Sequence, residues 1–174
     1  MLQAANQKSL FGDAPDLPDG MRYAPDFISP PEERALHGHL SDLPFKEFEF
    51  HGFLGKRRTV TFGWSYAFKG GGGLSKAGPI PEFLLPLRDR AAQFAVLAAA
   101  ALEHALILEY GPGAAIGGHK DRPQFGDVIG ISLLAPCTFR LRRKVGDKWE
   151  RRTLQADPRS ACLPEFWRDT AHIA

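Results

Sequence analysis

Apolar residues repeat at helical spacing in two segments of the first half of the chain. The first segment follows SPPE at 29–32, a typical helix start with serine as the N-cap, proline at the first helical position and glutamate at the third. Leu36, Leu40 and Leu43 follow it at near-helical spacing. The second segment begins at Pro81-Glu82 and carries an apolar stripe formed by Phe83, Leu84, Leu87, Ala91 and Phe94. The pattern predicts two helices that each bury one face.

Runs of β-branched and aromatic residues predict strands elsewhere. One run, KRRTVTF at 56–62, precedes a glycine tract at 70–73 that interrupts regular structure. From residue 105 onward the turn signals are closely spaced, and strands are predicted at 105–110, 127–134, 138–143 and 149–154. The last two are joined by a turn over residues 145–148. Helices followed by closely spaced strands predict an α+β fold with an antiparallel sandwich or jelly roll.

The composition indicates the number of domains and the cellular location. Residues 1–25 are rich in proline, aspartate, glycine and glutamine and predict a flexible arm, followed by one domain over 26–174. The net charge of +2 is compatible with a polyanionic partner without requiring one. Cys137 and Cys162 form no disulfide framework and no CxxC pattern, which favours the cytoplasm. The pattern gives no signal peptide and no membrane span, and we expect a monomer.

His119 and Asp121 are the candidate metal ligands. Residues two positions apart on an extended strand project from the same face, so both side chains can reach one ion. A histidine from a distant segment would complete a two-histidine, one-carboxylate triad, which leaves coordination positions for a cosubstrate and O2. His172 is the only histidine after Asp121. By itself, an HxD tripeptide is more often part of a surface loop than of a ligand set.

The residues around this pair resemble the AlkB-like Fe(II)/2-oxoglutarate-dependent dioxygenases. EYGPGAAIGGHKD at 109–121 is similar to the family signature NxYxPGxxIxxHxD, and FGDVIGISLL at 125–134 looks like the strand that follows it. KRR at 56–58 and FGWSYAF at 62–68 resemble the nucleotide-recognition region of the family, and IPEFL at 80–84 resembles its next helix. The matches keep the order of the family along the chain.

The resemblance implies an α+β double-stranded β-helix, or jelly roll, with N-terminal helices packed on one side. It implies that His119, Asp121 and His172 hold Fe(II). It also implies that Tyr110 binds 2-oxoglutarate, for which Arg168 is a further candidate. The implied reaction is the oxidative dealkylation of an N-alkylated base in DNA or RNA, a repair reaction that consumes O2 and releases an aldehyde, succinate and CO2. A structural alternative for Tyr110 is packing at a strand end.

Trp64, Tyr66 and Arg58 are the candidate substrate-binding residues. Aromatic side chains stack on unpaired bases and arginines contact phosphates, although alternating aromatics on a strand fit a protein core equally well. Other arginines form either a basic patch or an ordinary solvated surface: Arg57, Arg140, Arg142 and Arg143.

The chain departs from the family pattern in three places. The asparagine two residues before the tyrosine is replaced by Leu108, and the acidic residues after HxD are replaced by RPQ at 122–124, which leaves the substrate open between DNA, RNA and other molecules. The last strand of the family, whose arginine pairs with the cosubstrate carboxylate, has no match, so we expect that strand to be missing. A shortened reading frame near Cys162, a loss of activity or a substitute arginine would account for this; the candidates for the substitute are Arg140, Arg142 and Arg168.

Three functions therefore compete. The first is an Fe(II)- and 2-oxoglutarate-dependent dioxygenase that acts on alkylated DNA or RNA. The second is a catalytically impaired AlkB-like domain that binds nucleic acid or acts as an interaction module, and whose salt-dependent binding survives removal of the metal. The third is a cupin-like metal protein on which 2-oxoglutarate has no effect.

Overall fold

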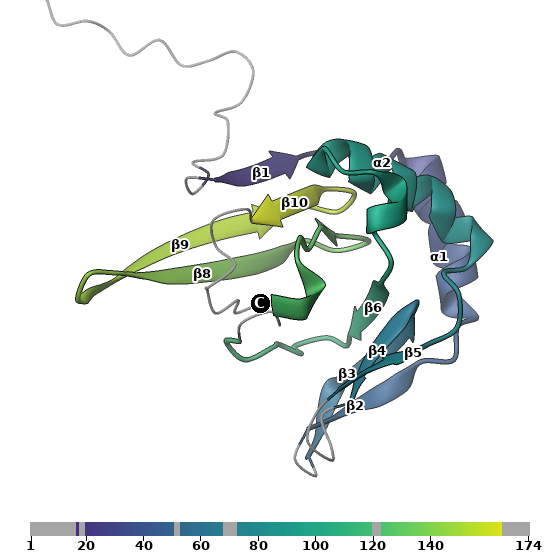
Figure 1. Cartoon of the computed structure of the whole chain (residues 1–174), viewed down its shortest axis with the longest axis horizontal. Helices are drawn as coiled ribbons and strands as arrows, with labels where there is room; N and C mark the ends of the chain where they lie inside the picture. The colour runs from purple at the N-terminus through teal and green to yellow at the C-terminus, as the bar shows by residue number, and fades with distance from the viewer. Residues whose placement is uncertain (1–16, 18–19, 51–52, 68–72, 120–122, 165–174) are drawn as a thin grey trace, which may run out of the picture.

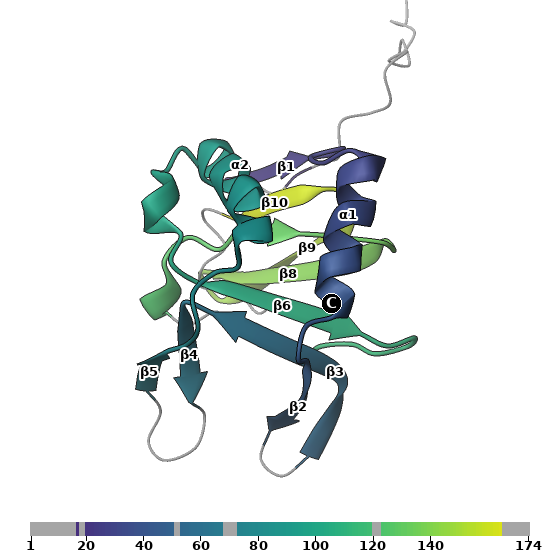
Figure 2. The same ribbon diagram turned by 90° about the vertical axis from the view of Figure 1, so that its right-hand side faces the viewer.

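The computed structural model describes residues 17, 20–50, 53–67, 73–119 and 123–164. These residues form a mixed α+β fold in which two helices lie against one side of several small antiparallel sheets (Figure 1, Figure 2). The predicted α+β class is confirmed at this level.

Both predicted helices are present, and local sequence signals explain where they begin. Helix α1 (Pro30–Ser41) starts with a capping box in which the Ser29 hydroxyl accepts from the Glu32 backbone N–H and the Glu32 carboxylate accepts from the Ser29 N–H. Helix α2 (Leu85–Ala95) is entered through a 3-10 turn, η1 (Glu82–Leu84). A second 3-10 turn, η2 (Ala99–Ala101), follows it.

The capping glutamate makes α1 sensitive to acid. Glu32 accepts a hydrogen bond from the Arg90 guanidinium of α2 at 2.6 Å, and this bond, with those from Ser29, lowers the pKa of the Glu32 carboxyl to about 2. A lowered pKa contributes stability above pH 4.5 that is lost as the pH falls towards 2. We therefore expect Glu32→Gln to flatten the pH dependence of unfolding between these values. Arg90→Gln should do the same in urea titrations, and an unchanged slope in both variants would contradict this assignment.

The strands form four small sheets. Two sheets have three strands each, in the orders β1-β10-β7 and β2-β3-β6, and two are hairpins, β4–β5 and β8–β9. The bounds of the strands are β1 Met21–Ala24, β2 Lys46–Phe50, β3 Phe53–Phe62, β4 Trp64–Ala67, β5 Gly73–Lys76, β6 Ala105–Tyr110, β7 Gly130–Ile131, β8 Cys137–Val145, β9 Lys148–Ala156 and β10 Ala161–Pro164. The turn that joins β8 to β9 contains Gly146 at φ +59°, which favours glycine.

The predicted strands are confirmed with one partial exception. The runs at 56–62 and 105–110 lie in β3 and β6, and the runs at 138–143 and 149–154 lie in β8 and β9. Only the short β7 is formed within the run predicted at 127–134. The sequence pattern missed β1, at the end of the stretch assigned to the N-terminal arm, which pairs along its whole length with β10.

The expected jelly roll is not formed by the described residues, and this part of the fold prediction is corrected. A jelly roll needs two packed sheets whose strands continue from one hairpin into the next. Within the described segments, β8 pairs with β9 and with no further strand, and the described positions between β6 and β7 contain the short 3-10 turn η3 (Pro123–Phe125) but no strand. Gly111, Pro112 and Gly113 begin that stretch, and such residues interrupt a ladder.

Two clusters of buried side chains form the core. The first lies between β8–β9 and β1–β10, and its buried residues are Met21, Leu141, Leu154 and Cys162. The second lies between the helices and the β2-β3-β6 sheet, where Ile28, Leu36 and Leu84 pack against partly buried residues that include Phe62, Ala105 and Ile107. Leu36 of the first predicted stripe and Phe83, Leu84 and Leu87 of the second lie in this cluster, so each helix buries part of its predicted apolar face.

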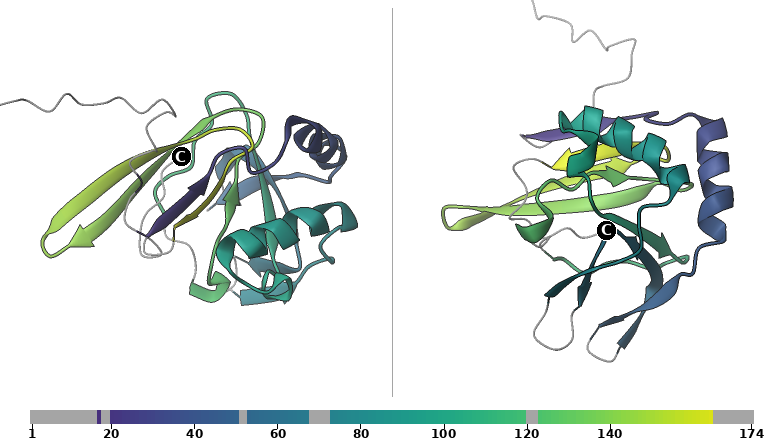
Figure 3. Two further views of the ribbon diagram at one scale, coloured as in Figure 1. Left: turned by 90° about the horizontal axis from the view of Figure 1, so that it is seen from above. Right: turned by 45° about the vertical axis from the view of Figure 1, so that its right-hand side comes forward.

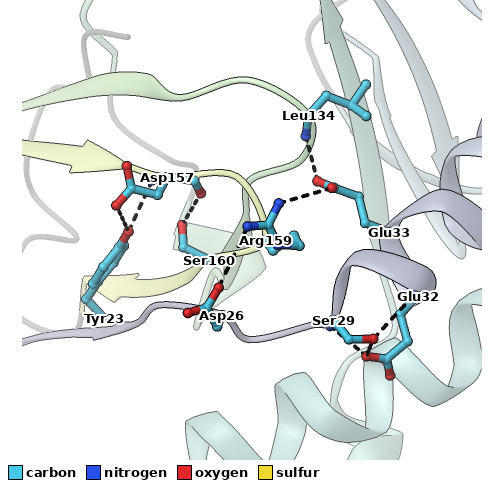
Figure 4. Close-up of polar contacts among 9 residues, drawn as sticks. All are labelled: Tyr23, Asp26, Ser29, Glu32, Glu33, Leu134, Asp157, Arg159 and Ser160. Carbon is cyan, nitrogen blue, oxygen red and sulfur yellow. Dashed lines mark hydrogen bonds and ion pairs between the residues drawn. The ribbon is translucent and has the colours of Figure 1, made fainter.

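A buried carboxylate joins the start of α1 to two loops. Glu33 of α1 is 8% exposed, and its carboxylate accepts from the Leu134 backbone N–H at 2.8 Å and from the Arg159 guanidinium at 3.4 Å (Figure 4). The carbonyl of Arg159 in turn accepts from the Phe27 N–H at 2.6 Å. These contacts hold the start of α1 against the loop after β7 and the turn between β9 and β10.

Candidate functional site

The β2-β3-β6 sheet has one covered and one open face, and Tyr110 lies on the open one. Paired residues of antiparallel strands share a face, and successive residues alternate between faces. Phe62, Ala105 and Ile107 pack under the helices. The other face of β6 carries side chains that remain 37–49% exposed, those of Leu106, Leu108 and Tyr110. The candidate cosubstrate tyrosine therefore lies on the face opposite to the one that packs under the helices. Figure 3 shows the position of the helices relative to the sheets.

Arg57 is the immediate neighbour of Tyr110 on this face. The two residues are paired in the β3–β6 ladder, and the Arg57 guanidinium lies close enough to the Tyr110 hydroxyl to act on its pKa. Burial raises the pKa of the Tyr110 hydroxyl, and Arg57 opposes this shift. Tyr110 is therefore a neutral phenol at physiological pH that can donate its O–H to an oxygen of a ligand, beside a guanidinium that can pair with a carboxylate.

Arg58 lies on the opposite face of the same strand. Its guanidinium makes a bidentate ion pair with Glu109, with two contacts of 2.7 Å, and lies 5.3 Å from the centroid of the Phe45 ring. Its side chain is 51% exposed. The structure thus separates two of the predicted site residues, Arg58 and Tyr110, onto different faces of one sheet.

Trp64 and Tyr66 lie on β4, the strand that follows β3. The indole N–H of Trp64 donates to the Glu103 carboxylate at 3.1 Å, which fixes the orientation of a half-buried ring. Gly63, immediately before it, has φ +77°, and a side chain there would meet the Glu103 carbonyl oxygen. For Tyr66 the structure gives the backbone pairing with Leu74 of β5.

His119 is exposed at the end of the loop that follows β6. Its Nδ1 lies 3.0 Å from the Gly117 carbonyl oxygen. If Nδ1 carries the proton and donates to this carbonyl, the lone pair of the ring lies on Nε2, the arrangement that metal-binding histidines commonly show. His119 thus fits a ligand of Fe(II), for which imidazole and carboxylate are suitable donors.

The other predicted ligands, Asp121 and His172, and the candidate cosubstrate residue Arg168 lie outside the described residues. Within the described ranges, no three histidine, cysteine or acidic side chains are grouped so as to hold a metal. The metal triad therefore remains a prediction from the sequence, and the structure adds the surroundings of its first member.

Comparison with known proteins identifies the family of the chain. Residues 20–164 match the model of the 2OG-Fe(II) oxygenase superfamily. The chain belongs to this superfamily and to its AlkB-like family. The family implies a 2-oxoglutarate-dependent oxygenase, and its members typically use Fe(II) and O2. A search of curated proteins gave no match. Neither helix in the described ranges has the length and apolar character needed to cross a membrane.

Proposed function

We propose that the protein is an Fe(II)- and 2-oxoglutarate-dependent dioxygenase that dealkylates an N-alkylated nucleic acid base. The observation that carries the proposal is the pair formed by Tyr110 and Arg57 on the open face of the sheet. It is one short loop away from His119 in a chain that belongs to the 2OG-Fe(II) oxygenase superfamily. A phenol O–H and a guanidinium side by side suit a dicarboxylic acid such as 2-oxoglutarate.

His119, Asp121 and His172 would hold the metal. Bound iron supplies the oxidising chemistry, together with O2 and 2-oxoglutarate, and the surrounding protein positions the reactants. Tyr110 would donate a hydrogen bond to the cosubstrate, and Arg57 would pair with its carboxylate. Arg168 stays a further candidate for that carboxylate.

The substrate residues are proposed on the other side of β3 and on β4. Glu103 orients the Trp64 ring, and the ring would present a fixed aromatic face to an unpaired base. Tyr66 would add a second aromatic side chain. Arg58 keeps half of its side chain exposed while Glu109 holds the guanidinium, so it would contact a phosphate at the edge of the sheet.

The proposal is tested by succinate formation from 2-oxoglutarate. The purified chain is supplied with Fe(II), O2 and a panel of single-stranded and duplex oligonucleotides that carry N-methylated bases. We expect succinate and formaldehyde in equal amounts with at least one oligonucleotide, and none without iron. Oligonucleotide binding that survives chelation of the metal, without any succinate, would contradict the proposal and favour the impaired-domain alternative.

The Tyr110–Arg57 pair gives a sharper prediction. A hydrogen bond to a charged group contributes about 1.5–3 kcal/mol, so Arg57→Gln should raise the KM for 2-oxoglutarate roughly tenfold or more. Tyr110→Phe removes a weaker bond and should raise it by a few-fold. The matched control is Arg34→Gln, the same substitution at an exposed position of α1, away from β3. A KM for 2-oxoglutarate that rises equally in the control would show that the effect is not specific to the open face.

A further inference from the structure

The β8–β9 hairpin has two faces of different chemistry. On one face, Phe139, Leu141 and Leu154 contribute to the core against β1–β10. The residues of the other face alternate with these, and we call it the basic face. It consists of Thr138, Arg140, Arg142 and Lys144 of β8 with Trp149, Arg151, Thr153 and Gln155 of β9.

The basic face concentrates positive charge without any carboxylate. It carries four cations, whereas the formal net charge of the whole chain is +2. The acidic residue within the two strands, Glu150, lies on the opposite face, where it pairs with Arg143 at 2.7 Å and Arg152 at 2.6 Å. A second acidic residue, Asp147, lies in the turn that joins them. Of the arginines predicted as a possible basic patch, Arg140 and Arg142 lie on the basic face, Arg143 lies on the opposite face of the hairpin, and Arg57 lies on β3.

Two features of the basic face are unfavourable for the isolated protein. Arg142 and Arg151 are directly opposite each other in the ladder, and like charges in that position are destabilising. The Nε of Arg142 is also buried and has no hydrogen-bond partner. A polyanion that covered this face would offset the repulsion between the Arg142 and Arg151 guanidinium groups.

An exposed aromatic side chain lies among these cations. Trp149 is 48% exposed, and the Arg142 guanidinium lies 4.8 Å from the centroid of its ring. The hairpin also projects beyond the other strands, so its turn lies at the edge of the molecule (Figure 1). Aromatic side chains next to cations on an open surface are the combination that binds single strands, because bases stack on the ring while phosphates meet the charges.

We propose that the basic face of the β8–β9 hairpin binds single-stranded nucleic acid. Arg140, Lys144 and Arg151 would contact phosphates, and Trp149 would stack on a base. The inference rests on the proposed function, because an enzyme that dealkylates a nucleic acid base must bind the strand that carries the base. It concerns a surface outside the metal and cosubstrate residues.

The test measures binding of a fluorescently labelled single-stranded DNA oligonucleotide by anisotropy, without iron or 2-oxoglutarate, over a series of salt concentrations. The variant Arg140→Gln/Arg151→Gln should raise the Kd at least tenfold. It should also lower the slope of log affinity against log salt by about 1.4, from about 0.7 for each lost phosphate contact. The matched control, Arg34→Gln/Arg88→Gln, removes the same charge from α1 and α2. It should change the Kd and the salt slope much less than Arg140→Gln/Arg151→Gln does.

Substitutions of Trp149 distinguish the contribution of base stacking from that of charge. Trp149→Ala should weaken binding roughly tenfold with little change in the salt slope, and Trp149→Phe should restore most of the affinity. Equal salt slopes for the two double variants, or tighter binding of a duplex than of the single strand, would overturn the inference.

Failure of this inference can be told apart from failure of the proposed function. An enzyme that forms succinate on an oligonucleotide, but whose affinity is unchanged in Arg140→Gln/Arg151→Gln, would overturn the binding surface alone. A chain that binds through the basic face and forms no succinate would overturn the proposed function alone.

Discussion

Replacing His119 by alanine is expected to reduce succinate formation at least a hundredfold. Removal of groups that only orient a metal ligand already costs about 10- to 100-fold in affinity or activity, so loss of the ligand itself should cost more. The His119 side chain is exposed, and substitutions at exposed positions usually change stability by no more than about 0.5 kcal/mol. We therefore expect the unfolding temperature of the metal-free variant to match that of the unchanged protein.

The matched control is His37→Ala, which removes an exposed imidazole from α1. It should leave both succinate formation and metal binding unchanged. Comparable turnover in His119→Ala and the unchanged protein would show that His119 is not a ligand. A large drop in unfolding temperature would point instead to a structural role.

Among the substitutions proposed for this protein, Leu141→Ala is expected to cause the largest decrease in the free energy of unfolding. Leu141 is 2% exposed and packs with Met21, Leu154 and Cys162 between the hairpin and the β1–β10 pair. Truncation of a buried leucine costs about 2–5 kcal/mol because the cavity closes only in part. For a chain of this size the unfolding temperature should fall by roughly 5–15 °C.

The control for this change is Leu134→Ala. Leu134 is 59% exposed and takes part in the fold through its backbone N–H, which the substitution keeps. We expect a change within about 0.5 kcal/mol, as is usual for surface positions. Similar losses in both variants, measured by urea unfolding, would contradict the placement of Leu141 in the core.

The elements that could be predicted from the sequence are those specified by neighbouring residues. The capping box at Ser29 and Glu32 fixes the start of α1 wherever that helix packs. The β8–β9 hairpin is likewise defined by two β-prone runs around Gly146. Strand β1 could not be found in this way, because four residues become a strand through pairing with β10, which is distant in sequence.

The candidate site likewise combines residues that could be predicted from local sequence with contacts that could not. His119 and Tyr110 could be proposed because they belong to one contiguous motif. The pairing of Tyr110 with Arg57, and the position of Arg58 on the opposite face, depend on the register between β3 and β6. A shift of one residue would place Arg58 instead of Arg57 opposite Tyr110. The apolar pattern of the two strands opposes such a shift, but local spacing does not show that these two strands pair.

The most direct test of the account is a calorimetric titration of 2-oxoglutarate into the protein with and without Mn(II). Manganese accepts the same imidazole and carboxylate donors as iron. We expect 2-oxoglutarate to bind with one-to-one stoichiometry when the metal is present, and binding to be lost in His119→Ala and weakened in Arg57→Gln. Metal binding without any binding of 2-oxoglutarate, or binding of 2-oxoglutarate that is the same in the absence of metal, would contradict it.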